Sequence, residues 1–486
     1  MSEEKKVSRR KYIAYAGAGV VIVAAAAAGG YYASKPPTKP SPATQTITQV
    51  VTKTYVSTPT PSPTLPKELP VSEDPIVFDV WPWGTQVIEM NVEDFKKQYD
   101  ENVKLEIIPG DYNAIMESKL MTKQPMDVCF GFLDAAFRWE KAGWILPVDE
   151  DPLFPEMKKD IIPAMIEACQ TVDGKFVGLP YGNQTLVIHR NIKMLEKAGY
   201  GKDFIPATEE ELINVCIELK KKGLSKYPLL LQLGPQDWMR PWLWFAFCHA
   251  EGDMLFDKKT LEPTFDVDTP CAHVLESWKT AWDEKLLPEG IFTTLEPDYM
   301  AMWMSGEHAY HTFWDQSRQF YNNPETSKIA GSSSIMPTLL GKNKETFTYL
   351  GCLYLISNIP RSPGKMKRVW NFGNFLAYKD KNGEFLVPKR YAVSAALFPM
   401  YRQLKDDPDI RAAWLKQVVY PEEIDYIFNM YEHMVSPIVY KTFWYLKWMP
   451  TLKDEIYNGV TGKKSIKDAI TSMRTTADEM WKTYAK

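Results

Sequence analysis

The sequence predicts an α/β protein of two lobes that follows an N-terminal membrane-anchor helix. Short apolar runs suited to buried strands alternate with amphipathic segments of helical period, which is typical of an open α/β sheet. About 410 of the 486 residues remain when the leader and linker are set aside, and a chain of that length suits two lobes better than one core. Ligands of such sheets lie at the carboxyl ends of the strands.

The N-terminal segment has the features of an export leader. A basic head (Lys5, Lys6, Arg9, Arg10, Lys11) precedes an uncharged run from Tyr12 to Ala33. A run of about 22 residues can cross roughly 30 Å of hydrocarbon as a helix, and basic residues are retained on the cytoplasmic side. We therefore expect residues 1–33 to be an export signal or membrane anchor, with the remaining chain on the extracellular face. Residues 8–13 resemble a twin-arginine export signal, so cleavage of the leader stays open.

Residues 34–74 are predicted to form a stalk. Ser, Thr and Pro dominate the stretch from Ser34 to Pro70, and it has too few large apolar side chains to build a core. A Pro-rich chain is semi-extended at about 3.1 Å per residue, so the stalk could hold the body up to about 100 Å from the bilayer.

The body is expected to begin with strands and helices in alternation. The expected order is strand 75–80, helix 91–99, strand 103–108, helix 112–121 and strand 126–132. A capping box at 208–211 predicts a helix that ends at Lys222. Further helices are expected at 268–283, at 365–377 and almost throughout the chain after Pro399.

Charge and motifs exclude several functions. The net charge is −4 with no basic block beyond the leader, which argues against nucleic-acid binding. No G-x-S-x-G, H-E-x-x-H or phosphate-cradling loop is present, so we expect no enzyme activity, cofactor or metal. His308 and His311 are three residues apart in an expected strand and would face opposite sides, so they are predicted to be buried and satisfied.

All six cysteines lie in the body without ligand-like spacing. Outside the cell they could pair in any of about 15 ways, or they could remain buried thiols, and both interpretations stay open. They are Cys129, Cys169, Cys216, Cys248, Cys271 and Cys352.

Several separate stretches resemble the extracellular solute-binding proteins of ABC importers, in particular the maltose-binding-protein-like group. Asp127-Val128 with Trp139 and Ala142–Asp149 is similar to the family's strand, helix and "a.sG.L.pL" turn. Asp173–Tyr181 is similar to the "dGK.yglPy" crossover, with Val187–Asn191 as the outgoing strand. Later matches are Met304–Ala309, Gly351–Ser357 with Ser362-Pro363, and Pro437 to Gly459. The resemblance covers roughly residues 75–486.

This resemblance implies a periplasmic-binding-protein-like fold, in which strand crossovers act as a hinge and a ligand cleft separates two lobes. Lobe one would comprise residues 75–183 plus 338–377, and lobe two residues 184–337 plus 378–486. It also implies a monomer that delivers its ligand to ABC permease subunits.

The aromatic content points to a carbohydrate ligand. The chain has 16 Trp, 25 Tyr and 22 Phe, and sugars present flat C–H faces that stack on aromatic rings. A sugar or oligosaccharide receptor is therefore the first hypothesis. The alternatives are an extracellular glycoside hydrolase, which needs two carboxylates about 5 to 10 Å apart, and a receptor for a polyamine, peptide or anion.

Ten residues are predicted to contact the ligand. Trp81 and Trp83 follow the first strand, and Asp134 follows the third, where a helix N-cap is the competing role. In the family, the first crossover forms the floor of the cleft, and Tyr181, Asn183 and Gln184 lie on this crossover. Asn183-Gln184-Thr185 is also an N-glycosylation sequon, but a hinge or ligand role is favoured because a crossover strand is a poor site for a glycan. For each aromatic residue, core packing is the competing role. The remaining four are Trp238, Trp314, Asp315 and Trp444.

Overall fold

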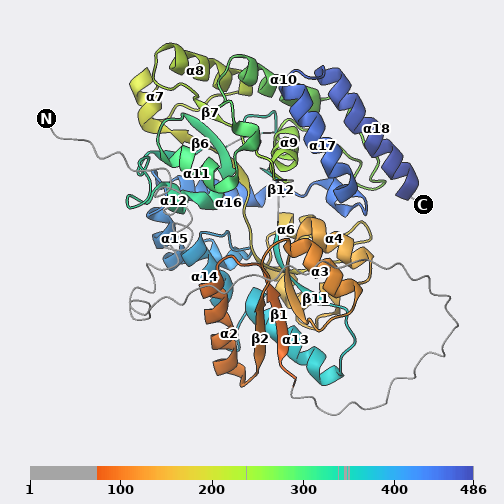
Figure 1. Ribbon diagram of the computed structural model, residues 1–486. Coiled ribbons are helices and arrows are strands. Elements are labelled where there is room, and N and C mark those ends of the chain that lie inside the picture. Colours follow the sequence, from red (N-terminus) through yellow and green to blue (C-terminus); the bar gives the residue numbers. More distant parts are fainter. Residues whose placement is uncertain (1–73, 237, 338, 344–346, 349–350, 485–486) are drawn as a thin grey trace, which may run out of the picture. The chain divides into compact units, whose positions relative to one another are not determined.

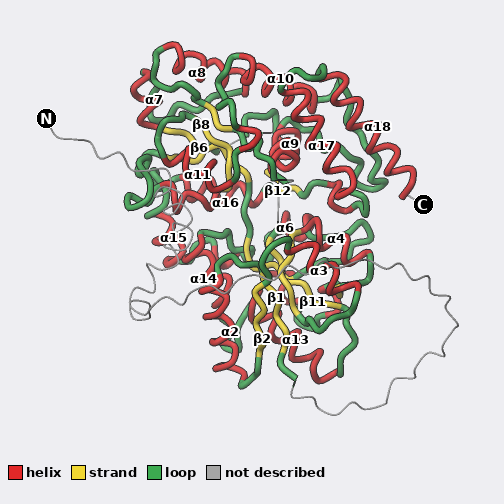
Figure 2. Tube along the Cα trace, in the orientation of Figure 1, coloured by secondary structure: helices red, strands yellow, loops and turns green. Residues whose placement is uncertain are grey.

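The computed structural model describes residues 74–484 except 237, 338, 344–346 and 349–350, and it does not describe the side chains of 347 and 348. The predicted anchor and the predicted stalk up to Glu73 lie outside these residues. Two separate sheets, each flanked by helices, organise the described chain (Figures 1 and 2).

Lobe one is built on the sheet ordered β2-β1-β3-β11-β4, with β5 paired to β11. Its β1 runs parallel to β2 and β3, whereas β11 is antiparallel to β3, β4 and β5. The sheet is therefore mixed rather than purely parallel, because β11 returns from lobe two. The strands are β1 Ile76–Val80, β2 Val103–Ile107, β3 Val128–Phe132, β4 Ile145–Leu146, β5 Leu179–Gly182 and β11 Cys352–Ser357.

The helices of lobe one follow the predicted order. Gly84, at φ 64°, turns the chain so that α2 begins at Thr85 and not at residue 91. The prediction of residues 112–121 as a helix is confirmed by α3. The helices are α2 Thr85–Tyr99, α3 Tyr112–Met121, α4 Leu133–Lys141, α5 Phe154–Asp160, α6 Pro163–Ala168, α13 Pro363–Ala377 and α14 Leu386–Ala395, with 3-10 turns η1 Val148–Glu150 and η4 Arg402–Leu404.

Lobe two is built on the sheet ordered β7-β8-β6-β9. The predicted capping box is present in modified form at the start of α8. Thr208 Oγ1 accepts from the Glu211 N–H, while the Glu211 carboxylate accepts from the N–H of Ala207 and not of Thr208. The strands are β6 Leu186–Asn191, β7 Leu229–Leu230, β8 Tyr310–Trp314 and β9 Ser333–Ile335. The helices between β6 and β9 in the chain are α7 Ile192–Ala198, α8 Glu209–Lys221, α9 Met239–Ala250, α10 Pro270–Asp283, α11 Glu296–Met304 and α12 Arg318–Tyr321, with the 3-10 turns η2 Ile291–Thr293 and η3 Asp315–Ser317.

The chain after Pro399 is less helical than predicted. Between its helices lie the short strand β12, Met434–Val435, which pairs with β10, Phe347–Thr348, and the 3-10 turn η5, Ile438–Lys441. Both β12 and η5 follow helix α16, and they contact α6 and α4 of lobe one, respectively. The helices here are α15 Pro408–Leu415, α16 Glu423–Glu432, α17 Tyr445–Val460 and α18 Ile466–Tyr484.

Residues 378–404 pack on lobe one, although they are predicted above to lie in lobe two. Helix α14 contacts α2, α13 and β5, and Arg390 pairs with Asp94 of α2. Lys379 also pairs with Asp160 at 2.8 Å, and the Tyr401 hydroxyl donates to the carbonyl of Pro180. These polar contacts fix the segment on lobe one, so the crossing to lobe two occurs later, between α14 and α16.

Candidate ligand-binding cleft

Five aromatic side chains form a row that runs from lobe one to lobe two. Trp81 follows β1, and its ring centroid lies 6.2 Å from that of Phe132 at the end of β3. Phe132 in turn lies 6.0 Å from Trp242 of α9 in lobe two. Trp242 lies 5.2 Å from Trp238 and 5.8 Å from Trp314, the last residue of β8. We call these five residues the interlobe aromatic row.

The aromatic row is partly open to solvent, and one of its members, Trp242, has an unsatisfied polar atom. Trp81 is 40% exposed, Phe132 and Trp238 are half-buried, and Trp242 and Trp314 are buried. The buried indole N–H of Trp242 has no hydrogen-bond partner among the described residues. In the connection from β7 to α9, the same holds for both amide atoms of Gln232 and for the side-chain oxygen of Gln236. Buried polar atoms normally have partners, so this segment has capacity left for a polar ligand.

Gln184 connects the first crossover to the end of β8. Its side-chain oxygen accepts a hydrogen bond from the amide of Gln316, two residues after Trp314. Trp83 is half-buried against the core after β1. Trp81 and Trp83 therefore follow the end of β1, Trp314 ends β8 and Gln184 lies on the first crossover, whereas Trp238 is the N-cap residue of α9.

Asn183 and Asp315 lie in the hinge, and their side chains are occupied by protein partners. Asn183 is fully buried, and its oxygen accepts from the backbone N–H groups of Gln184 and Gly351. Asp315 accepts from the Thr185 N–H at 3.0 Å and the Tyr431 hydroxyl at 2.9 Å, and it pairs with buried Arg318. Burial raises the pKa of Asp315, whereas Arg318 and these two donors lower it. A ligand contact by either side chain would require breaking these bonds.

Tyr181 and Trp444 belong to the cores of the two lobes. Tyr181 stacks on Tyr354 with ring centroids 4.2 Å apart, and burial raises its pKa well above the ordinary value of 10.0. Trp444 is 3% exposed and packs against Phe256 and Trp448 of lobe two. The structure thus places Trp444 away from the aromatic row, because the start of α17 turns its ring into the helical layer.

Asp134 lies in the first turn of α4, directly after Phe132, and is half-buried. Burial raises the pKa of its carboxyl group, and the charge of Arg138 opposes this shift. Its side chain makes no capping bond at the N-cap position, so the N-cap alternative is not observed.

Phe132 and Trp242 join the row although neither is predicted above. Trp242 lies four residues after Trp238 at the start of α9, and this spacing puts two side chains on one helix face. Phe132 is the last residue of β3, where ligands of α/β sheets bind. Both signals are present in the sequence.

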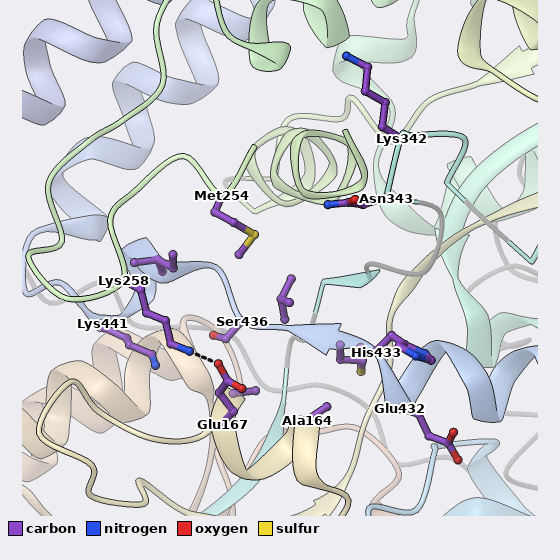
Figure 3. Close-up of a pocket in the computed structure, with 14 residues that line it drawn as sticks. Ala164, Glu167, Met254, Lys258, Lys342, Asn343, Glu432, His433, Ser436 and Lys441 are labelled. Atoms are coloured by element: carbon purple, nitrogen blue, oxygen red, sulfur yellow. Dashed lines mark hydrogen bonds and ion pairs between the residues drawn. The ribbon is translucent and has the colours of Figure 1, made fainter. Parts of the chain in front are cut away.

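A second feature is a cavity of about 670 Å³ that none of the ten predicted residues lines. It lies between α6, the segment after α9, and the chain from Glu432 to Lys441 (Figure 3). The ion pair between Lys258 and Glu167 crosses it from one lobe to the other.

Other site chemistry is limited in the part of the chain that the structure describes. No group of three or more metal-ligating side chains occurs there. Both histidines are buried as predicted. The Nε2 atom of His311 hydrogen-bonds to the Tyr321 hydroxyl, and Nδ1 of His308 to the Tyr227 carbonyl. The Nδ1 atom of His311 has no hydrogen-bond partner among the described residues, so the imidazole of His311 is only partly satisfied, contrary to the prediction. All six cysteines are described, each is buried, and no two of them form a disulfide. Within residues 74–484, no helix has both the length and the apolarity needed to cross a membrane.

Comparison with known proteins decides the family. Residues 91–394 match the family described as bacterial extracellular solute-binding protein. The chain belongs to this family. Extracellular solute-binding proteins act by binding and work outside the cytoplasm, in agreement with the two-lobe fold and the predicted location of the body. No curated protein sequence matches the chain.

Solved structures of solute-binding proteins share the fold. Maltose-bound T. maritima MalE3 superposes with a TM-score of 0.68 at 18% identity, over 83% of this chain and 99% of that chain. An ABC transporter solute-binding protein from Agrobacterium radiobacter K84, in complex with ribitol, gives 0.68 at 17% identity, over 85% and 100%. The GacH receptor of Streptomyces glaucescens, described with acarbose, gives 0.66 at 16% identity, over 84% and 99%.

Proposed function

We propose that this solute-binding protein is an extracytoplasmic receptor that binds a sugar or oligosaccharide and delivers it to an ABC permease. The interlobe aromatic row is the observation that carries the proposal, because it offers ring faces from both lobes to one ligand. Structural neighbours described with maltose, ribitol, acarbose and D-mannitol support the ligand class.

The row suits a sugar for two physical reasons. Its rings match the flat C–H faces of a pyranose, and the unsatisfied indole N–H of Trp242 would supply a donor for a hydroxyl group. Since Trp81 and Phe132 lie on lobe one and the three tryptophans on lobe two, a bound sugar would favour closure of the lobes.

The proposed activity is binding without a covalent step. A glycoside hydrolase needs two carboxylates about 5 to 10 Å apart on either side of the bond that it cleaves. Of the two predicted site carboxylates, Asp315 is paired with Arg318 inside the hinge. Incubation of the pure protein with glycosides should yield no reducing ends beyond the molar amount of protein.

The proposal includes attachment to the membrane through residues 1–33 and a monomeric receptor. The basic head and the uncharged run that follows it support this topology. The stalk would then allow the body to reach the permease.

A ligand screen followed by titration of one variant tests the function. Maltose, maltotriose, acarbose, ribitol and mannitol, with spermidine and a tripeptide as other classes, are added in thermal-shift assays of the full chain. A ligand at 100 times its Kd should add about 2.7 kcal/mol to the free energy of unfolding. The best ligand is then titrated calorimetrically against wild type and Trp81→Ala.

Trp81→Ala should weaken sugar binding by about tenfold, equivalent to about 1.4 kcal/mol, with little change in the Tm of the free protein because Trp81 is exposed. The control is Trp481→Ala in α18, whose indole N–H donates to the Thr260 carbonyl far along the chain from the row. Equal sugar affinity in the two variants, or stabilisation by spermidine or peptide alone, would contradict the proposal.

A further inference from the structure

The cavity between α6 and β12 has the construction of a second ligand site. Lobe one supplies Ala164 and Glu167, lobe two supplies Met254 and Lys258, and β12 with the residues after it supplies the wall between them. Its volume of about 670 Å³ falls within the range of small-molecule sites, about 300 to 1,000 Å³. No residue of the interlobe aromatic row lines it.

The charged side chains around this cavity leave an excess of positive charge. Three lysines (Lys258, Lys342, Lys441) and two glutamates (Glu167, Glu432) line it. Glu167 is paired with Lys258, and Glu432 is paired at 2.7 Å with Lys405, which lies outside the lining. Lys342 and Lys441 therefore have no ion pair with a described residue.

Lys441 is the lysine best placed to hold an anion. It extends from η5, and its Nζ lies 5.7 Å from the centroid of the Phe137 ring. Burial lowers the pKa of Lys441 and the charge of Lys258 lowers it further, whereas Cys169 and Glu167 act in the opposite direction. An anion beside this ammonium group would also favour its charged form.

Ser436 provides an independent indication of a ligand. Its side chain lines the cavity one residue after β12 and is 8% exposed, yet its hydroxyl has no hydrogen-bond partner among the described residues (Figure 3). A buried hydroxyl without a partner costs about 1 to 3 kcal/mol, which a ligand oxygen could recover. Apolar surface from Ala168, Val435 and Ile438 lies alongside.

We propose that this cavity binds an organic anion, with its carboxylate or phosphate group at Lys441 and Ser436 and its apolar body against Ala168, Val435 and Ile438. The site shares no residue with the proposed sugar site, and the proposal of an anion site does not rest on the proposed sugar function.

A ligand here would also act on the hinge. Met434 of β12 lines the cavity, and its sulfur accepts from the Asn183 amide at 3.1 Å in the first crossover. Since both lobes contribute to the wall, occupancy would favour one angle between them. Binding in the aromatic row and in the cavity would then be coupled by the same factor in both directions.

Benzoate and phenyl phosphate are suitable probes, and benzyl alcohol is their neutral counterpart. Each is titrated calorimetrically into the full-length protein at constant ionic strength. Both anions share the apolar ring, so a difference between them identifies the preferred head group. We expect saturable binding of at least one anion and none of benzyl alcohol at the same concentrations.

The variants locate the binding. Lys441→Met should weaken anion binding at least tenfold, and Ser436→Ala a few-fold, whereas Lys467→Met on the exposed face of α18 should have no effect. If Lys441→Met does not fold, Lys258→Met replaces it, since Lys258 is exposed and its loss leaves the Glu167 carboxylate to repel the anion. Trp81→Ala should leave anion affinity unchanged, which separates this test from that of the sugar site.

Absence of saturable binding of either anion would overturn the proposal. So would equal affinities of Lys441→Met and Lys467→Met, or equal binding of benzyl alcohol and the anions.

Discussion

At the scale of single residues, burial determines which aromatic side chains are available to a ligand. Trp81 and Trp444 have the same side chain, and both are predicted to stack on the ligand. Trp81 follows the carboxyl end of β1 and is 40% exposed, whereas Trp444 enters the helical layer of lobe two between Phe256 and Trp448. The sequence motif around each residue does not distinguish these two environments.

Trp444→Ala should therefore destabilise the protein rather than weaken binding alone. Removal of a buried tryptophan leaves a cavity and costs about 3 to 5 kcal/mol of unfolding free energy. Urea denaturation of the ligand-free variant should show this loss, with Trp81→Ala as the control that keeps its stability. An unchanged urea midpoint for Trp444→Ala would move this ring back to the cleft.

Glu209 should make stability depend on pH. It is the first residue of α8 and is buried, and burial raises its pKa to about 8, with the charge of Glu251 acting in the same direction. In the unfolded chain its pKa is about 4.3. Between these values the unfolded state loses a proton that the folded state keeps, so the free energy of unfolding falls as pH rises from about 4.5 to 8.

Glu209→Gln should remove this dependence. The variant should match wild type near pH 4.5 and exceed its unfolding free energy by a few kcal/mol at pH 8. Denaturation at both pH values measures the effect. Glu210→Gln is the control, since Glu210 is the exposed neighbour in the same helical turn and near the same helix dipole. Parallel pH profiles of the two variants would refute the role of Glu209.

At the scale of elements, the hinge is held by buried polar contacts between segments far apart in the sequence. Asp315 joins the end of β8 to the first crossover through Thr185 and to α16 through Tyr431. Arg318 adds a bond to the carbonyl of Ala396 at the end of α14, and its guanidinium lies 4.4 Å from the Trp414 ring centroid. One ion pair therefore contacts several segments at the connection between the lobes.

Asp315→Asn should destabilise the folded protein by about 3 to 5 kcal/mol, because Arg318 would remain buried without a counter-charge. The asparagine oxygen can still accept from Thr185 and Tyr431, so the loss reports on the charge. Thermal melts of the ligand-free protein measure it, with Asp298→Asn on the exposed first turn of α11 as the control. Equal Tm values for both variants would show that the pair contributes nothing net.

The elements that sequence patterns predict best are those with local signals. Helix α3 has the predicted bounds, and α8 has its predicted cap residue. The pairing of β12 with β10 and the packing of α14 on lobe one depend on partners nearly a hundred or several hundred residues away, such as Asp94 for Arg390. No local pattern carries that information.

At the scale of the whole molecule, we predict a body held outside the cell by its N-terminal segment. Protease added to intact cells should release a fragment whose N-terminus lies between about residues 34 and 70, since an extended Pro-rich stalk exposes its backbone. Immunoblotting and N-terminal sequencing of the released fragment test this. Cells that are lysed before protease treatment serve as the control, and they should yield the same fragment if the body itself resists digestion. Full-length protein recovered from the cytosol of treated intact cells would contradict the topology.

The sequence by itself determined the α/β class and the solute-binding family. These depend on hydrophobic period and on the order of short motifs, both of which are local in the chain. It also predicted Trp81, Trp238 and Trp314, which do lie in the interlobe aromatic row.

Only the tertiary structure decided which predicted residues remain accessible and how the lobes divide. Asn183 and Asp315 became hinge residues because donors from Gly351, Tyr431 and Arg318 meet them in space. The cavity at Lys441 and Ser436 likewise arises where α6, the segment after α9 and β12 converge. Burial and long-range pairing are properties of the packed chain, and the order of residues along the sequence does not state them.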